Sequence, residues 1–386
     1  LAASGLGNMW CNAFGAAIQS GLAMGLDSLA PHAYGGKEKK LIGLYVQRSI
    51  VIVSISCLPI AILWLLAGVC LQYVFRIDVE MSNLAALWVW WRLPGLWPYG
   101  IFDCYRRFLL AQNVAWPISM ACTVVFVIHV FLTNWMVEKY DFIGASISIS
   151  ISTWLMLFLL IAIAHIRDYF VPASERTSDC WPPFDWAEVR KGCPHYFQFA
   201  FPSALSLFLE WGGYEIYASF AAQLGQTQLA ANAILGPATS GLWYVIPFGE
   251  SIAASTLMGN ALGGRMHETA KHMAILAYVL AILFALVNGL CALFYWKLWG
   301  RMWTNDEDVI EMLSSMLYVM LAYSLMDCLK CAGMTLLRGV GRTSLTVWGN
   351  VVAQVVIGYP ISYFLSHSLG LIGVWIGMTT AWAISG

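Results

Sequence analysis

Long apolar runs separated by short polar segments make up most of the chain. About 20 apolar residues cross a bilayer as a helix, and four runs contain no Asp, Glu, Lys or Arg: 49–75, 116–137, 142–166 and 272–296. The uncharged stretch 343–386 is too long for one crossing and is interrupted near 367–370, so it predicts two helices. Five further runs carry at least one acidic residue: 9–32, 83–104, 195–222, 230–259 and 309–336. The pattern predicts eleven membrane-spanning helices.

The sequence also matches itself at a nearly fixed spacing. The matched segments are 1–3 with 229–231 and 35–36 with 263–264 at a shift of 228 residues, and 143–144 with 372–373 at a shift of 229. The helix that begins near His195 has no counterpart in the front half, so we expect a parent protein of twelve helices whose first helix is absent from this chain. An even number of helices in each repeat preserves orientation, which predicts a parallel repeat.

The expected fold is an all-α polytopic membrane protein with two six-helix lobes. Residues 1–167 are predicted to form the N-terminal lobe with helices two to six. Residues 192–386 are predicted to form the C-terminal lobe with helices seven to twelve, the last of them truncated. The segment 168–191 contains three prolines among mixed charges and is predicted to be the cytoplasmic linker between the lobes.

Basic residues concentrate in alternate loops of this pattern. Fifteen of the twenty Lys and Arg residues fall in the predicted loops on one side, and Lys330 and Arg338 are assigned to one of these loops. Because basic loops stay cytoplasmic, the bias predicts that the N-terminal end of the chain faces outside.

Composition narrows the classes of function. Apolar residues make up 60% of the chain and charged residues 11%, and the mean hydropathy of +0.70 fits a lipid environment. The net charge of -1 provides no basic surface for nucleic acid. Among the ten cysteines only Cys328 and Cys331 form a CxxC pair, and no second pair completes a zinc site. We therefore expect no nucleic-acid partner, no metal and no cofactor.

Catalytic motifs are missing from the sequence. His267 and His272 flank Glu268, but they are five residues apart where a zinc-binding helix needs four. The sequence contains no P-loop and no Gly-x-Ser-x-Gly nucleophile motif. We expect a protein that is not an enzyme and that takes its energy from an ion gradient or from a separate partner protein. A membrane enzyme or a scaffold is the alternative of a different class.

Acidic residues inside the predicted spans are the candidate functional groups, because charge in hydrocarbon is costly. They are Asp27, Asp103, Glu210, Glu215, Glu250 and Asp327. Asp103 is followed three positions later by Arg106, and Asp327 is followed in the same way by Lys330. A local ion pair and a role in the transport path both remain open for these two acids.

The remaining acids fall into two groups. Asp27 precedes the basic segment 37–40, with which it can pair, or it can sense protons; Glu250 is a candidate third site. Glu210 and Glu215 are five residues apart, which places them about 140° apart on a helix. Tyr214 shares the face of Glu210 and Trp211 that of Glu215, and a carboxylate beside an aromatic ring suits an organic cation or a proton. A glutamate that only packs through a helix–helix hydrogen bond is the alternative.

Several motifs resemble eukaryotic members of the multidrug and toxin extrusion (MATE) family. They are Leu209-Glu210-Trp211 followed by Tyr214-Glu215, the stretch 253–263 (AASTLMGNALG), the turn 337–341 (LRGVG), and 25–35 (GLDSLAPHAYG) followed by Gln47-Arg48. The resemblance implies two six-helix lobes, alternating access, and export of organic cations or related metabolites in exchange for protons or sodium. It also implies that Glu210 and Glu215 match the paired acids of the family's seventh helix and Asp327 an acid of its tenth. Lys330, Glu250 and His32 depart from the family pattern.

The resulting hypothesis is an antiporter in which a proton and a cationic substrate compete for Glu210. Aromatic residues at 211–214 and 243–247, which include Trp243, are expected to shape a broad apolar pocket. The alternatives are a lipid or oligosaccharide flippase and a major-facilitator transporter. We expect a monomer in the plasma membrane or a vacuole-type membrane, with small organic substrates and the lipid bilayer as its partners.

Overall fold

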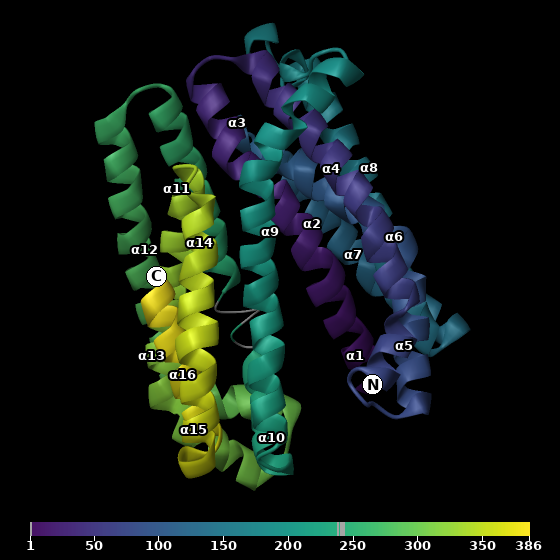
Figure 1. Ribbon diagram of the computed structural model, residues 1–386, viewed down its shortest axis with the longest axis vertical. Coiled ribbons are helices and arrows are strands. Elements are labelled where there is room, and N and C mark those ends of the chain that lie inside the picture. Colours follow the sequence, from purple (N-terminus) through teal and green to yellow (C-terminus); the bar gives the residue numbers. More distant parts are fainter. Residues whose placement is uncertain (1, 238, 240–243) are drawn as a thin grey trace. The chain divides into compact units, whose positions relative to one another are not determined.

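The computed structural model describes residues 2–237, 239 and 244–386, and these residues form helices joined by short turns, with no strand among them (Figure 1). Contacts divide the chain into two compact units, which we call unit 1 (residues 1–208) and unit 2 (residues 209–386). The boundary between the units lies inside one long helix, α9 (Trp186–Ala222). Each unit is described below by itself.

Unit 1 begins with broken helical segments and continues with long helices. Its elements before α9 are α1 (Ala2–Cys11), the π-helical turn η1 (Asn12–Ala16), α2 (Ala17–Ala23), α3 (Gly25–Gly35), α4 (Lys39–Leu65), α5 (Ala67–Tyr73), α6 (Val79–Ala111), α7 (Trp116–Tyr140), α8 (Phe142–Phe170), η2 (Ala173–Glu175) and η3 (Ser178–Cys180). In the core of unit 1, residues from α2, α3, α4, α6 and α8 pack together.

Unit 2 has a similar plan. Its elements after α9 are α10 (Gln226–Pro237), α11 (Val245–Gly263), α12 (His267–Trp303), α13 (Glu307–Gly339), α14 (Thr343–Asn350), the π-helical turn η5 (Val351–Gly358), α15 (Tyr359–Leu369) and α16 (Leu371–Ser385). The core of this unit is rich in aromatic and methionine side chains from α9, α13 and α16.

Six helices in the described part of the chain are long and apolar enough to cross a membrane. They are Lys39–Leu65, Trp116–Tyr140, Phe142–Phe170, His267–Trp303, Glu307–Gly339 and Thr343–Leu369. Large apolar side chains on these helices are exposed, for example Phe126, Phe131 and Phe294 at 68%, 71% and 78%. Soluble monomers rarely expose so much contiguous apolar surface, so the protein is an integral, multi-pass membrane protein.

The repeat predicted from the sequence recurs in the helix boundaries. A shift of 228 residues carries α6 (Val79–Ala111) onto α13 (Glu307–Gly339), and it carries the first residue of α4 onto that of α12. The N-terminal caps of these helices match as well, because the side chains of Asp78 and Asp306 each accept a hydrogen bond from the backbone N–H of the residue two positions later. Equal caps at equal spacing mean that the two units use the same helix plan.

A close helical hairpin recurs in both units, and glycine makes it possible. Asp141 (φ 52°, ψ -136°) joins α7 to α8, and Gly370 (φ 60°, ψ -136°) joins α15 to α16. Three residues into the second helix of each hairpin lies a glycine, Gly144 or Gly373. A Cβ at Gly144 would overlap the carbonyl group of Met136, and the first helix packs equally closely against Gly373.

Replacing Gly144 or Gly373 with alanine is expected to destabilise the protein by about 1–3 kcal/mol, because the obstructing atoms belong to backbone and cannot rotate away. The matched control is Gly5→Ala, since a Cβ there meets nothing within 4 Å. Thermal unfolding in detergent measures the effect. Equal midpoints for Gly144→Ala and Gly5→Ala would mean that the hairpins are not closely packed.

The segment 168–191, predicted to be a linker, folds against unit 1. Asp168 accepts hydrogen bonds from the backbone N–H groups of Thr177 and Ser178 at 3.1 and 2.7 Å. Gln47 of α4 donates a bond of 2.8 Å to the carbonyl oxygen of Pro182. The first half of α9 also belongs to this unit, because the buried Tyr196 hydroxyl donates to the carbonyl oxygen of Leu22 at 2.8 Å.

Candidate functional site

A small cavity in unit 2 holds two of the predicted acids. Glu210 contributes from α9, and Tyr244 and Phe248 contribute from the start of α11. The other lining residues are Asp327, Lys330, Cys331, Met334 and Arg338. These five residues of α13 lie on one face of the helix, because residues three, four or seven positions apart fall on the same side of a helix. The cavity has room for about one water molecule in this conformation.

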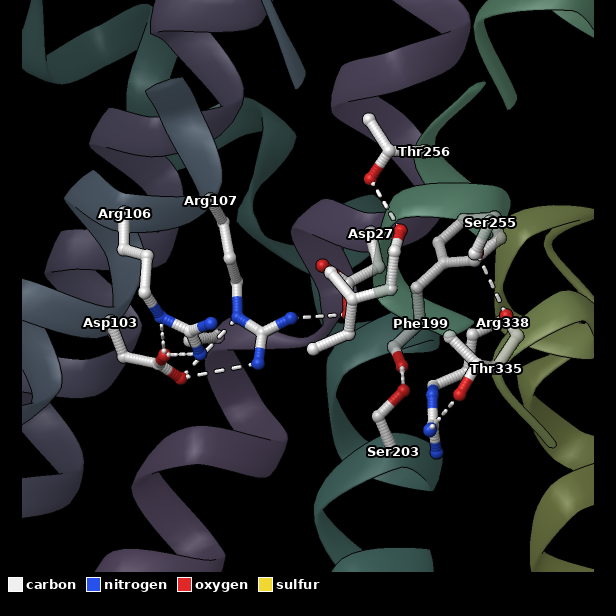
Figure 2. A network of polar contacts seen from close by, with 12 residues as sticks. Asp27, Asp103, Arg106, Arg107, Phe199, Ser203, Ser255, Thr256, Thr335 and Arg338 are labelled. Atoms are coloured by element: carbon white, nitrogen blue, oxygen red, sulfur yellow. Dashed lines mark hydrogen bonds and ion pairs between the residues drawn. The ribbon is translucent and has the colours of Figure 1, made fainter. Parts of the chain in front are cut away.

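The charged side chains of this cavity are removed from water. Glu210 is 8% exposed, Asp327 5% and Lys330 2%. Arg338 is equally buried and donates a hydrogen bond of 3.2 Å to the hydroxyl of Thr335, whose backbone carbonyl accepts from Ser255 (Figure 2). Lys330 and Arg338 therefore do not belong to a loop as the sequence predicts, because α13 continues as far as Gly339.

Lys330 is the central group of the cavity. Its Nζ lies 3.0 Å from Oε1 of Glu210, across from α13 to α9. The same nitrogen lies 3.8 Å from the centre of the Trp382 ring, on α16. The contact with Glu210 has the distance of an ion pair but not the geometry of a hydrogen bond. The ammonium group therefore lies between a carboxylate and an aromatic face.

Asp327 does not form the local ion pair that its spacing from Lys330 allows. Within the described residues its Oδ1 has no hydrogen-bond partner, and the ammonium of Lys330 is directed to Glu210 instead. Asp327 is left as a second acid in the same cavity, one helical turn from Lys330.

An aromatic cluster forms the wall behind the lysine. Tyr214 meets the Trp382 ring edge-on with centroids 5.6 Å apart. Its hydroxyl lies 3.0 Å from that of Tyr323, and Tyr323 in turn packs against Trp382. Tyr214 thus lies on the Glu210 side of α9, as the helical spacing predicts. Trp382 and Tyr323 were not predicted as site residues, and neither carries a charge that would have marked it.

Three other predicted candidates lie away from this cavity. Glu215 is exposed and Trp211 is half-buried, and neither lines the cavity. Glu250, on α11, is half-buried; its Oε2 accepts a weak bond of 3.5 Å from Ser251. Glu210 and Glu215 lie on different sides of α9, as expected from the angle of about 140° between two residues five positions apart on a helix. Trp243 lies outside the described residues.

The two candidate acids of unit 1 are held by arginines. Arg107 of α6 pairs with Asp27 of α3 and, at 3.3 Å, with Asp103 of its own helix. Arg106 also pairs with Asp103, so the local ion pair, one of the two possibilities left open by the sequence, is present (Figure 2). Arg107 is only 3% exposed. The network ties α3 to α6.

A second cavity, in unit 1, has a different chemistry. It is lined mainly by apolar and small residues of α1, α6 and α8, together with Arg92 and Tyr99. Arg92 donates a bond of 3.0 Å to the side-chain oxygen of Asn8. None of the lining residues of this cavity is acidic. The unit 2 cavity is therefore the stronger candidate for binding a proton or a cation.

Known proteins share both the sequence and the fold. Residues 1–135 and 202–364 match the MatE family profile. Two relatives from Arabidopsis thaliana are each 28% identical: Protein DETOXIFICATION 51 over 99% of this chain and 71% of its own length, and Protein DETOXIFICATION 16 over 99% and 78%.

Two solved structures have the same fold. The crystal structure of the eukaryotic MATE transporter AtDTX14 matches with a TM-score of 0.89 at 24% identity, covering 100% of this chain and 85% of that one. A crystal structure of the Vibrio cholerae MATE transporter VcmN matches with a TM-score of 0.87 at 17% identity, covering 100% and 86%. The family match together with the membrane-spanning helices leads to one conclusion: the chain belongs to the MATE family and is a multi-pass membrane transporter of the eukaryotic type, not an enzyme.

Proposed function

We propose that the chain is a secondary active antiporter that exports small organic compounds carrying a positive group, such as drugs or toxic metabolites, in exchange for protons. One observation carries the proposal: the buried carboxylate of Glu210 already holds a cation, the Lys330 ammonium, against the Trp382 ring. A carboxylate that binds one cation in an aromatic cavity has the chemistry to exchange it for another, or for a proton.

The exchange follows from competition at Glu210. A proton removes the negative charge of this carboxylate, and a bound cationic group uses that charge, so the two exclude each other. When either one occupies Glu210, the Lys330 ammonium loses the partner that it has in this structure. Tyr214 contributes to the aromatic wall that accepts the organic part of the substrate.

The closed cavity implies a conformational step. Room for about one water molecule does not admit an organic substrate, so the helices around Glu210 must separate before binding. We propose that the lobes 1–167 and 192–386 alternate access to this cavity across the segment 168–191. Glu215, Trp211 and Glu250 are proposed to contribute in an open state, whereas Asp27 and Asp103 act in the packing of unit 1.

Uptake into proteoliposomes tests the function. A fluorescent dye with a cationic group is offered under an imposed pH gradient, under an imposed sodium gradient, and with no gradient. Uptake driven by the pH gradient alone is expected. Uptake driven only by the sodium gradient would mean that sodium, not the proton, is the coupling ion. No uptake under either gradient would contradict antiport and favour a lipid or oligosaccharide flippase.

A further inference from the structure

The position that a cationic substrate would take is filled by the chain itself. The Lys330 ammonium has both contacts that an organic cation would seek here, the Glu210 carboxylate at 3.0 Å and the Trp382 ring at 3.8 Å from its centroid. The side chain is 2% exposed, so bulk water does not screen its charge. Lys330 is therefore a tethered cation within the proposed exchange site.

A substrate that binds Glu210 displaces this ammonium but cannot remove it from the cavity. A simple organic cation would then share a small, buried space with a second positive charge, and like charges repel strongly where water is excluded. A zwitterion brings an acidic group as well, and that group offers the displaced ammonium a new partner. The two classes of substrate should differ in affinity for this reason alone.

We infer that Lys330 is a specificity-determining residue that disfavours organic monocations and favours zwitterions with the same aromatic body. The inference rests on the proposed exchange at Glu210 and names the class of substrate. It depends on the difference that one positive charge makes between two substrates with the same aromatic body. Removing the lysine shifts the preference of the cavity toward substrates with one more positive charge.

A matched pair of dyes measures this shift. Rhodamine B is a zwitterion at neutral pH, and its ethyl ester is the corresponding monocation. Their dissociation constants are measured by fluorescence polarisation with purified protein in detergent, without any gradient. In Lys330→Met the ratio of the affinity for the ester to the affinity for the acid should rise by about tenfold or more over the wild-type ratio. A tenfold change in this ratio corresponds to about 1.4 kcal/mol, which the loss of one buried charge can supply.

Three further variants make the measurement specific. Lys330→Arg keeps the positive charge and should keep the wild-type ratio. Asp327→Asn removes a negative charge from the same cavity and should shift the ratio the opposite way, toward the zwitterion. Lys297→Met removes a lysine that also lies over a tryptophan ring, that of Trp296, but on the exposed part of α12, and should change nothing.

The outcomes separate this inference from the proposed function. An unchanged ratio in Lys330→Met overturns the inference even if gradient-driven uptake by the wild type is intact. If Lys330→Met does not fold, the sign of the shift in Asp327→Asn decides, and no shift there overturns it. Failure of the wild type to bind either dye also overturns it, because the cavity would not accept this class of compound.

Discussion

Glu210→Gln is expected to lower gradient-driven exchange by about a hundredfold or more. The amide of glutamine neither takes up nor releases a proton near neutral pH, and it carries no charge to attract a cationic group or Lys330. Truncating one partner of a buried charge pair typically costs about 2–5 kcal/mol, and each 1.4 kcal/mol is about tenfold. Initial rates of dye uptake in proteoliposomes under a pH gradient measure the loss.

The variant also leaves the buried Lys330 without its counter-ion, so a loss of activity could reflect a loss of stability. The double variant Glu210→Gln with Lys330→Met removes both charges of the pair. Replacing a buried ion pair by uncharged groups is often neutral for stability, so we expect the double variant to regain the wild-type unfolding temperature but not the exchange. Wild-type uptake by the double variant would rule out Glu210 as the exchange group.

Arg107→Met is expected to destabilise the protein by about 3–5 kcal/mol, because it removes the partner that the buried Asp103 and the partly exposed Asp27 share. Arg106→Met is the matched control, since Arg106 pairs with the same Asp103 but is 22% exposed, against 3% for Arg107. Its cost should be about 1 kcal/mol. Denaturant or thermal unfolding in detergent measures both.

A different result would change the role of this network. If Arg107→Met and Arg106→Met unfold at the same temperature as the wild type but lose exchange, Asp27 and Asp103 belong to the transport path. Retained exchange with reduced stability supports the structural role. The sequence left these two possibilities open because spacing alone does not distinguish an ion pair that stabilises the fold from one that takes part in transport.

Much of the helical fold follows from local features of the sequence. Apolar runs of about 20 residues predict spans, and most of the described residues of each predicted run are helical. The repeat was visible in only a few matched residues, yet the boundaries of α6 and α13 coincide at a shift of 228. Side chains diverged between the repeats, whereas caps such as Asp78 and Asp306 are tied to backbone geometry.

The candidate site was only partly predictable. Acids inside apolar runs included Glu210 and Asp327, because a carboxylate in hydrocarbon is costly. The same criterion also selected four acids that do not line this cavity. Lys330 was assigned to a loop because a basic residue near the end of a span usually marks one. Its partner Trp382 lies in an uncharged run without any polar signal. Contacts between α9, α13 and α16 join residues that no sequence spacing relates.

The local sequences around Asp103 and Asp327 are alike, but they do not predict the same role. Asp103 and Asp327 precede a cysteine in the two repeats, but at a shift of 228 Asp103 falls on Cys331 and Asp327 falls on Tyr99. The two acids therefore occupy positions one helical turn apart on α6 and α13. One is held by arginines and the other lines a cavity, so similar local sequence leads to different roles.

The most direct test reverses the coupling. Proteoliposomes with equal pH on both sides are given a gradient of the dye, and the internal pH is followed with a trapped indicator. In the wild type, dye movement should drive protons the opposite way, and in Glu210→Gln with Lys330→Met this proton flux should disappear. Dye movement without proton flux in the wild type, or an undiminished flux in the double variant, would contradict exchange at Glu210.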